Sequence, residues 1–441
     1  MSIASIIFLL VFAAAVWWFT RNVRRIRRNI LLGRDVDRTD RRDERWALMA
    51  KVALGQSKMV VRPVAGLLHI VVYAGFVIIN IEVLEIIIDG IFGTHRVFSF
   101  LGGFYDFLIG SFEFLALLTW VACAIFLIRR FVLRIKRFWS REMTAWPRTD
   151  AGLILTFEIL LMSAFLLMNA ADHTLQGMGS EHYISAGAFP VSAVLAGWLD
   201  FGSIDAATLI GIERFCWWFH IIGILGFLNY LPYSKHFHIL LAFPNVWYSK
   251  LKPKTEMSEM PRVAAEVKSM LDPSIPPPPP PAEPAPGMPA EHFGAKDVFD
   301  LTWKSLMDAY TCTECGRCTS VCPANLTGKL LSPRKIVMDT RDRLEEVGHV
   351  IDSKGKWEDD GKDLFSRISE EELWACTTCN ACTQACPVNI DPVEIILDMR
   401  RYLVMEQSKP SPSLNAMFTT IENNGAAWAF GPDKRMDWMK E

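Results

Sequence analysis

Five long apolar stretches constrain the fold of this 441-residue chain more than any other feature. A helix that crosses a bilayer needs roughly 20 mainly apolar residues. The stretches that meet this requirement are residues 3–20, 64–88, 104–128, 151–171 and 206–231. Hydrophobic residues make up 51% of the chain, which excludes a disordered protein and an ordinary soluble one. The sequence therefore predicts five transmembrane helices in the N-terminal half.

The positive charges predict how these helices are oriented. Thirteen Lys or Arg lie between the first and second stretches, and seven lie between the third and fourth. The other two connections contain only Arg96. By the positive-inside rule both basic loops are cytoplasmic, so the N-terminus lies outside and the C-terminal half inside. The basic residues follow the first stretch instead of preceding it, which favours an uncleaved anchor over a signal peptide. The net charge of −2 gives no indication of a nucleic-acid partner.

Eight of the ten cysteines form two copies of the pattern C-x2-C-x2-C-x3-C-P. In this pattern three thiolates on one tight loop bind one [4Fe–4S] cube, and the fourth reaches the cube of the other loop. The predicted ligands are Cys312, Cys315, Cys318 and Cys386 for the first cluster, and Cys376, Cys379, Cys382 and Cys322 for the second. Zinc sites use paired C-x2-C units, and disulfides are excluded by a reducing cytoplasm. Cys123 and Cys216 lie inside apolar stretches and are expected to be core residues.

Helix-start signals follow both cysteine motifs. Ser332 with Pro333, and Asp391 with Pro392, are typical of the first turn of a helix. This repeat of loop and helix resembles the α-helical two-cluster ferredoxin domain of the iron–sulfur subunits of succinate dehydrogenase and heterodisulfide reductase. The resemblance covers residues 297–407. It implies an all-α fold with two [4Fe–4S] clusters.

The composition between the two halves predicts a linker. Residues 274–294 include six consecutive prolines, which favour an extended polyproline II spacer that holds one domain away from another. We therefore expect a transmembrane domain (1–250), a proline-rich linker (251–294), a ferredoxin domain (295–407) and a C-terminal docking tail (408–441).

Histidines in the membrane part predict a haem. His69 lies near the start of the second stretch, and His220 and His238 lie in and just after the fifth. Histidines on two helices at comparable depth are what bis-imidazole ligation of a haem b requires. His220 and His238 are eighteen residues apart, about 27 Å along a helix, so they cannot bind the same iron. Depth alone permits His69 to pair with either.

The pattern H-x11-P-Y-S-K-x2-H, from His220 to His238, resembles the last membrane helix of the cytochrome b (gamma) subunit of respiratory nitrate reductase. It is similar also to the membrane subunit of heterodisulfide reductase. The resemblance implies that His69 and His238 bind the haem nearest the cytoplasm. In the family a second haem is bound by a histidine at the position of Ile79 in this chain. The sequence is therefore consistent with either one haem or two. His220 and His173 are the candidates for a second haem or a quinone site.

The resemblance implies a membrane-bound electron-transfer subunit of a respiratory quinone oxidoreductase in the bacterial inner membrane. It would pass electrons between menaquinone, haem b and a soluble catalytic partner. Glu82 and Glu158 are candidates for a proton relay to the quinone. No organic-substrate motif is present, so we expect the partner to be a cysteine-rich heterodisulfide reductase-like protein or an electron-transfer flavoprotein. The alternative is a non-catalytic anchor and electron wire, or a redox sensor, without a quinone site.

Overall fold

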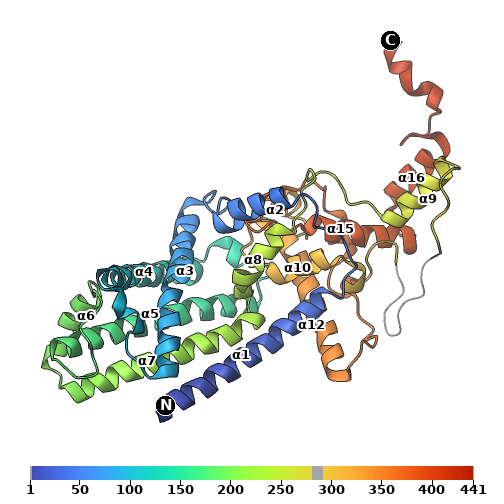
Figure 1. Cartoon of the computed structure of the whole chain (residues 1–441). Coiled ribbons are helices and arrows are strands. Elements are labelled where there is room, and N and C mark those ends of the chain that lie inside the picture. Colours follow the sequence, from blue (N-terminus) through green and yellow to red (C-terminus); the bar gives the residue numbers. More distant parts are fainter. Residues whose placement is uncertain (1, 281–291, 441) are drawn as a thin grey trace.

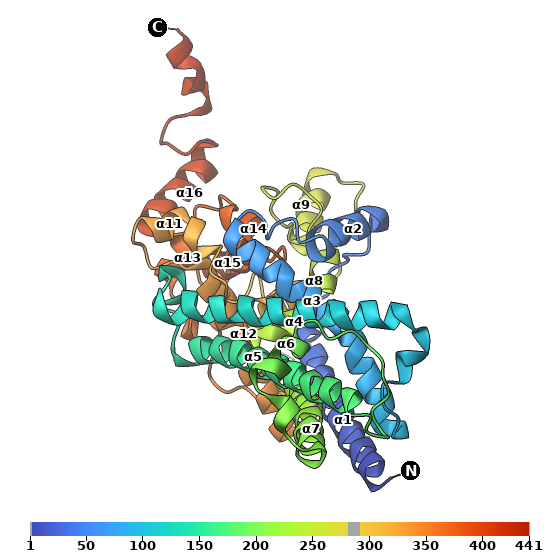
Figure 2. The ribbon, with the colours of Figure 1, turned by 90° about the vertical axis from the view of Figure 1, so that its left-hand side faces the viewer.

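The structure is a computed structural model that describes residues 2–280 and 292–440. Within these residues every regular element is a helix, apart from an isolated bridge between Arg34 and Thr302. Five helices are long and apolar enough to cross a membrane, which confirms the predicted number. They are α1 (Ile3–Ile30), α3 (Pro63–Phe92), α4 (Gly103–Leu127), α5 (Ala145–Gly177) and α7 (Ala206–Tyr230). Figures 1 and 2 show these helices gathered into one bundle.

The ends of these helices follow from their sequences. The side chains of Ser2 and Asp205 accept hydrogen bonds from the first turns of α1 and α7, and Pro63 occupies the first turn of α3. Gly93 ends α3 with a φ of +72°. Helix α1 has 28 residues and continues ten residues past its apolar stretch. At about 1.5 Å per residue it is longer than the roughly 30 Å hydrocarbon core of a bilayer.

Helix α5 lies in the centre of the bundle and packs against α4 and α7. Ile109, Phe165 and Leu209 are fully buried between these helices. Cys123 and Cys216 are buried there too, as expected for core residues. The short helix α6 (Ser192–Trp198) packs against α5 at the end of the bundle farthest from the cysteine motifs.

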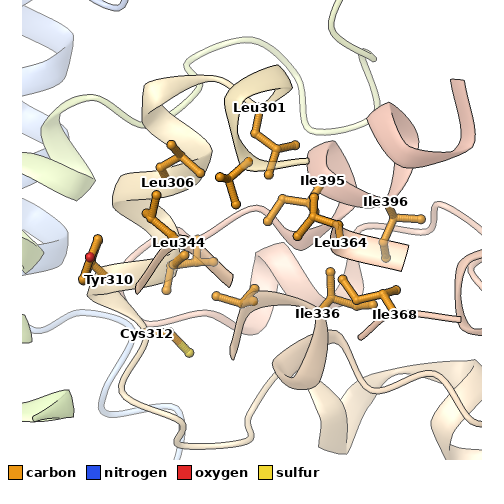
Figure 3. Packing of buried hydrophobic residues seen from close by; sticks show 14 of the residues in the cluster. Leu301, Leu306, Tyr310, Cys312, Ile336, Leu344, Leu364, Ile368, Ile395 and Ile396 are labelled. Carbon is orange, nitrogen blue, oxygen red and sulfur yellow. The ribbon is translucent and has the colours of Figure 1, made fainter. Parts of the chain in front are cut away.

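The C-terminal domain is built from short helices around the cysteine loops. They are α10 (Trp303–Thr311), α11 (Pro323–Leu326), α12 (Pro333–Lys354), α13 (Glu370–Trp374), α14 (Ala381–Ala385) and α15 (Pro392–Arg401). Ser332 and Asp391 cap α12 and α15, as predicted. Figure 3 shows the core that these helices enclose, with Leu306, Ile336 and Leu344 pointing toward one another.

This domain packs directly on the bundle, although the sequence predicts a proline-rich spacer between the two parts; residues 281–291 of that segment lie outside the described residues. Ile26 and Ile30 of α1 belong to the same hydrophobic cluster as the core of the domain. The Arg28 guanidinium lies 2.5 Å from the Asp352 carboxylate, and Asn29 donates a hydrogen bond of 2.8 Å to the Tyr310 hydroxyl. The parts are held together because the end of α1 carries groups complementary to the domain.

The remaining helices surround this junction or extend beyond it (Figure 1). They are α2 (Arg42–Met49), α8 (His238–Trp247), α9 (Pro261–Leu271) and α16 (Pro412–Asn424). Helix α9 lies inside the predicted linker, whose residues 281–291 are outside the described residues. Exposed apolar side chains mark the tail after α16, where Trp428 and Trp438 are 56% and 75% exposed.

Candidate metal centres

The eight motif cysteines line two separate cavities. One cavity is lined by Cys312, Cys315, Cys318 and Cys386. The other is lined by Cys322, Cys376, Cys379 and Cys382. Each cavity thus combines three cysteines of one motif with the fourth cysteine of the other. The structure therefore groups the cysteines in the same two sets of four that the spacing predicts.

The two cysteine loops have the same backbone conformation at equivalent positions. Glu314 and Thr378, each two residues after the first cysteine of its motif, have φ values of +54°. Gly316 and Asn380, two residues further on, have φ values of +69° and +58°. Glycine and asparagine tolerate this left-handed region best. These turns wrap each loop around its cavity and bring three sulfur atoms to one side of it.

The spacing of the sulfur atoms suits a cluster better than a single ion. Within residues 2–280 and 292–440, no three His, Cys, Asp or Glu side chains are grouped closely enough to hold one metal ion. A tetrahedral zinc site would need four such ligands around one point. Four cysteines around a cavity fit a [4Fe–4S] cube, which binds one thiolate at each iron. Burial raises the pKa of Cys312, Cys382 and Cys386 to about 12, so iron must displace their protons.

The cavity of Cys312, Cys315, Cys318 and Cys386, here called the inner cavity, faces the bundle. The Lys58 ammonium, in the loop before α3, donates a hydrogen bond of 3.0 Å to the carbonyl oxygen of Cys386. The Lys235 ammonium forms an ion pair with Glu314. The Lys235 contact attaches the first cysteine motif to the membrane part, and the Lys58 contact attaches the second.

The cavity of Cys322, Cys376, Cys379 and Cys382, here called the outer cavity, lies nearer the protein surface. Cys379 is exposed, whereas the ligands of the inner cavity are buried or half-buried. Leu326 and Leu330, which are close in sequence to the lining residues Ala324 and Leu331, are 69% and 44% exposed. A redox partner in solution can therefore approach the outer cavity more closely than the inner one.

The structure brings two of the predicted haem ligands together. The imidazole centres of His69 on α3 and His238 at the start of α8 are 6.5 Å apart, with 43° between the ring planes. The Nδ1 atom of His238 lies 3.1 Å from the carbonyl oxygen of Lys235 and can donate to it, which leaves Nε2 free. The Nδ1 atom of His69 is buried and has no hydrogen-bond partner among the described residues.

This separation fits an iron between the two rings. Two metal–nitrogen bonds of about 2 Å, together with the distance from each nitrogen to its ring centre, give a separation of this size. The Nδ1 hydrogen bond of His238 is also typical of metal-bound histidines, whose second nitrogen usually donates to a carbonyl or carboxylate. The residues present therefore fit a bis-imidazole haem.

The other predicted candidates lie apart from this pair. His220 is buried on α7, where its Nδ1 atom lies 3.0 Å from the carbonyl oxygen of Leu161 and its ring packs against Phe165. His173 packs against Phe189 at the far end of α5 and is not in contact with His220.

The two proton-relay candidates differ in their surroundings. Glu82 on α3 is 3% exposed, and one of its carboxylate oxygens has no partner among the described residues. Glu158 on α5 is half-buried. Other acidic residues of the bundle have structural partners: Glu85 accepts a hydrogen bond from Tyr105, and Glu213 is paired with Arg214.

These features define a class of protein: a membrane-associated iron–sulfur electron-transfer protein. Residues 311–390 match the family described as "4Fe-4S dicluster domain", which confirms two [4Fe–4S] clusters and locates them in the C-terminal domain. No solved structure matches the chain.

Two of the relatives match most of the chain, and others match only its C-terminal part or less. The Bacillus subtilis protein "Probable iron-sulfur-binding oxidoreductase FadF" is 29% identical over 99% of this chain and 61% of its own length. "EtfAB:quinone oxidoreductase" of Syntrophomonas wolfei is 25% identical over 92% of this chain and 55% of its own length. "Probable membrane-anchored ferredoxin" of Chromohalobacter salexigens is 31% identical over 34% of this chain and 24% of its own length. The chain thus spans little more than half the length of the first two relatives.

The residues that join the cysteine loops to the bundle were not predicted from the sequence. Lys58, Lys235 and Glu314 lie far apart in the chain, and their pairing depends on how the domain docks. One feature of the sequence could have indicated this contact: Glu314 lies between the first two cysteines of a motif. A carboxylate buried at this position needs a cationic partner.

Proposed function

We propose that this protein is the membrane subunit of a respiratory quinone oxidoreductase, which carries electrons between menaquinone, a haem b and a soluble partner through two [4Fe–4S] clusters. The observation that carries this proposal is the pair of imidazoles, His69 and His238, beside the inner cavity. A haem b ligated by these residues would supply one-electron transfer within the bundle. Such a haem would link a two-electron quinone to one-electron iron–sulfur clusters.

The ligand sets of the two clusters follow from the cavities. Cys312, Cys315, Cys318 and Cys386 would bind the inner cluster. Cys376, Cys379, Cys382 and Cys322 would bind the outer cluster. The positions of the two cavities support the order haem, inner cluster, outer cluster and partner. The direction in which electrons move along this order depends on the partner.

The relatives support the identity of the two electron-exchange partners. One of them is named an EtfAB:quinone oxidoreductase, so an electron-transfer flavoprotein is the soluble partner that we propose for this chain. We place the basic loops and the C-terminal domain on the cytoplasmic side of the inner membrane, as the positive-inside rule requires. The exposed tail residues Trp428 and Trp438 could then contact the partner.

Protons must accompany the quinone reaction. Glu82 is the stronger of the two candidates for the relay, because its buried carboxyl has an unpartnered oxygen in the middle of a polar region of the bundle. A carboxyl group in such a position can accept and release a proton as the quinone changes redox state. His220 is the candidate residue for the quinone site or for a second haem.

The haem ligands provide the decisive test. Replacing either His69 or His238 by Ala should remove the same low-spin haem b signal, because one imidazole cannot keep the iron six-coordinate. Replacing His220 should leave that signal in place, so it is the matched control. Optical and electron paramagnetic resonance spectra of purified protein measure the result. Loss of the signal in the His220 variant and its retention in the His238 variant would contradict the pairing.

A second measurement separates this function from an electron wire or sensor. Menaquinol added to membranes that contain the protein should reduce the haem. A protein without a quinone site would show no reduction, although dithionite would still reduce both the haem and the clusters.

A further inference from the structure

Two arginines at the junction between the bundle and the first cysteine loop have no acidic partner. Arg317 is only 5% exposed and lines the inner cavity. Its single hydrogen bond, 2.9 Å long, goes to the carbonyl oxygen of Lys58. Arg62, four residues after Lys58, donates a hydrogen bond of 2.6 Å to the Ser320 hydroxyl. Among the residues that the structure describes, neither guanidinium forms an ion pair.

Arg317 is buried and Arg62 is half-buried. A buried charge without a counter-charge is costly, so Arg317 predicts an anion, which Arg62 would also face. The acidic residues of the junction are already engaged. Glu314 is paired with Lys235 and Arg341, and Glu142 is paired with Arg334. The anion must therefore come from a bound group.

The position of the two arginines relative to His69 indicates which group this is. Arg62 precedes helix α3 at its N-cap, seven residues before His69. Arg62 has non-helical backbone angles, φ −116° and ψ 88°, and it lies at the start of α3 about two helical turns, or roughly 10 Å, from His69. Arg317 comes from the other side of the junction and is one of the charged groups that act on His69. Both arginines thus lie on the domain-facing side of the imidazole pair.

We propose that Arg317 and Arg62 form a binding site for the propionate carboxylates of the haem that lies between His69 and His238. This inference rests on the proposed haem. Haem b has two propionates on one edge, and guanidinium groups bind carboxylates through short, charge-assisted hydrogen bonds. The site would turn the propionate edge toward the inner cluster, which faces Arg317 from its other side.

The inner cluster is the competing explanation for Arg317, since four thiolates give it a negative charge. It does not explain Arg62, which is not among the residues that line the inner cavity. A test must therefore separate the haem carboxylates from the cluster.

The test compares haem b with its dimethyl ester, in which both carboxylates are neutral. Full-length protein is produced without haem and with its clusters, and each porphyrin is titrated while the low-spin absorbance is recorded. Wild-type protein should bind haem b about tenfold more tightly than the ester, as expected for a charge-assisted contact. Replacing Arg317 or Arg62 by Met should remove most of this preference and leave ester binding unchanged.

The matched control is Arg28→Met, which removes another arginine of the same junction, one that is paired with Asp352. It should keep the full preference for haem b. The presence of the cluster signals in paramagnetic resonance verifies that each variant is folded. If the Arg317 variant does not fold, the Arg62 variant alone tests the proposed site. If both the Arg317 and the Arg62 variants keep the full preference for haem b over its ester, the proposed site is wrong. If the Arg317 variant keeps this preference and only its cluster signals change, Arg317 is a neighbour of the cluster and not of the haem. A wild-type protein that forms no low-spin complex with either porphyrin would overturn the haem itself.

Discussion

Cys386 belongs to the second cysteine motif by sequence, but its side chain lines the cavity of the first. If it ligates the inner cluster, Cys386→Ser should remove the inner-cluster signal from paramagnetic resonance spectra and leave most of the outer-cluster signal. Serine is a poorer iron ligand than a thiolate, and the other three ligands of the inner cluster come from a different loop. The control is Cys123→Ser, a buried cysteine of the bundle, which should keep both signals. Loss confined to the outer cluster would show that ligation is not crossed.

Lys235 contacts both a proposed haem ligand and the first cysteine loop. Its carbonyl oxygen accepts the hydrogen bond that orients His238, and its ammonium group is paired with the buried Glu314 of the cysteine loop. Replacing Lys235 by Met keeps this carbonyl but removes the ion pair that fixes its position, so haem binding should weaken by about tenfold. It should also change the low-spin haem spectrum.

Haem titration and paramagnetic resonance measure both effects of the Lys235 change. Lys252→Met is a suitable control, because Lys252 is exposed and is paired only with Glu256. Equal spectra for the Lys235 variant and the wild type would show that the ammonium group has no role in positioning His238.

At the scale of single helices, Asp391 gives a prediction about pH. It caps α15, and burial together with the carboxylates of Glu394 and Asp308 raises its pKa to about 6, from 3.8. Because the folded-state pKa is raised, Asp391 contributes stability that is present below pH 4 and is lost as the pH rises through 6. Stability of the wild type should therefore fall across this interval, with a contribution from Asp391 of up to about 3 kcal/mol.

Asp391→Asn should remove this part of the pH dependence and raise stability at pH 7, because asparagine caps a helix without a charge. The stability of Asp391→Ala at pH 7 should rise less, because this variant also loses the helix cap, which is worth about 1 kcal/mol. Thermal unfolding, followed by the loss of cluster absorbance at several pH values, provides the measurement. An asparagine variant with the wild-type pH profile would contradict the assignment.

Local patterns predicted these elements well. The five apolar stretches and the caps at Ser332 and Asp391 depend on short-range spacing, which the sequence shows directly. The grouping of the cysteines joins two motifs that are distant in sequence, and it was predicted from the general behaviour of this repeated motif. The ends of the helices were less predictable: α1 continues to Ile30 through a basic segment, because one face of that segment, which includes Ile26 and Ile30, packs on the domain. The role of residues 251–294 as a spacer was inferred from composition alone, which carries no information about contacts distant in sequence.

At the scale of the whole molecule, the docking of the C-terminal domain determines the order of the centres. The inner cavity is attached to the bundle by Lys58 and Lys235, whereas Cys379 of the outer cavity is exposed. A water-soluble paramagnetic ion complex should therefore accelerate the spin relaxation of the outer cluster much more than that of the inner cluster. Pulsed paramagnetic resonance on the detergent-solubilised protein measures the two rates. Equal acceleration would mean that the domain does not dock as described.

No sequence pattern indicated this docking, because its contacts join residues more than 70 positions apart, such as Lys235 with Glu314 and Arg28 with Asp352. Each partner alone is an ordinary charged residue. Only the folded arrangement distinguishes Lys235 from the other lysines near the membrane helices.

The contacts between the membrane part and the inner cavity bear on how the inner cluster is assembled. Lys58 and Lys235 belong to the loops around the membrane helices, and Arg334, which lines the cavity, is paired with Glu142 from the loop before α5. Once these contacts have formed, side chains of both parts surround the inner cysteines. We therefore expect the inner cluster to be loaded before the C-terminal domain is finally seated on the membrane part.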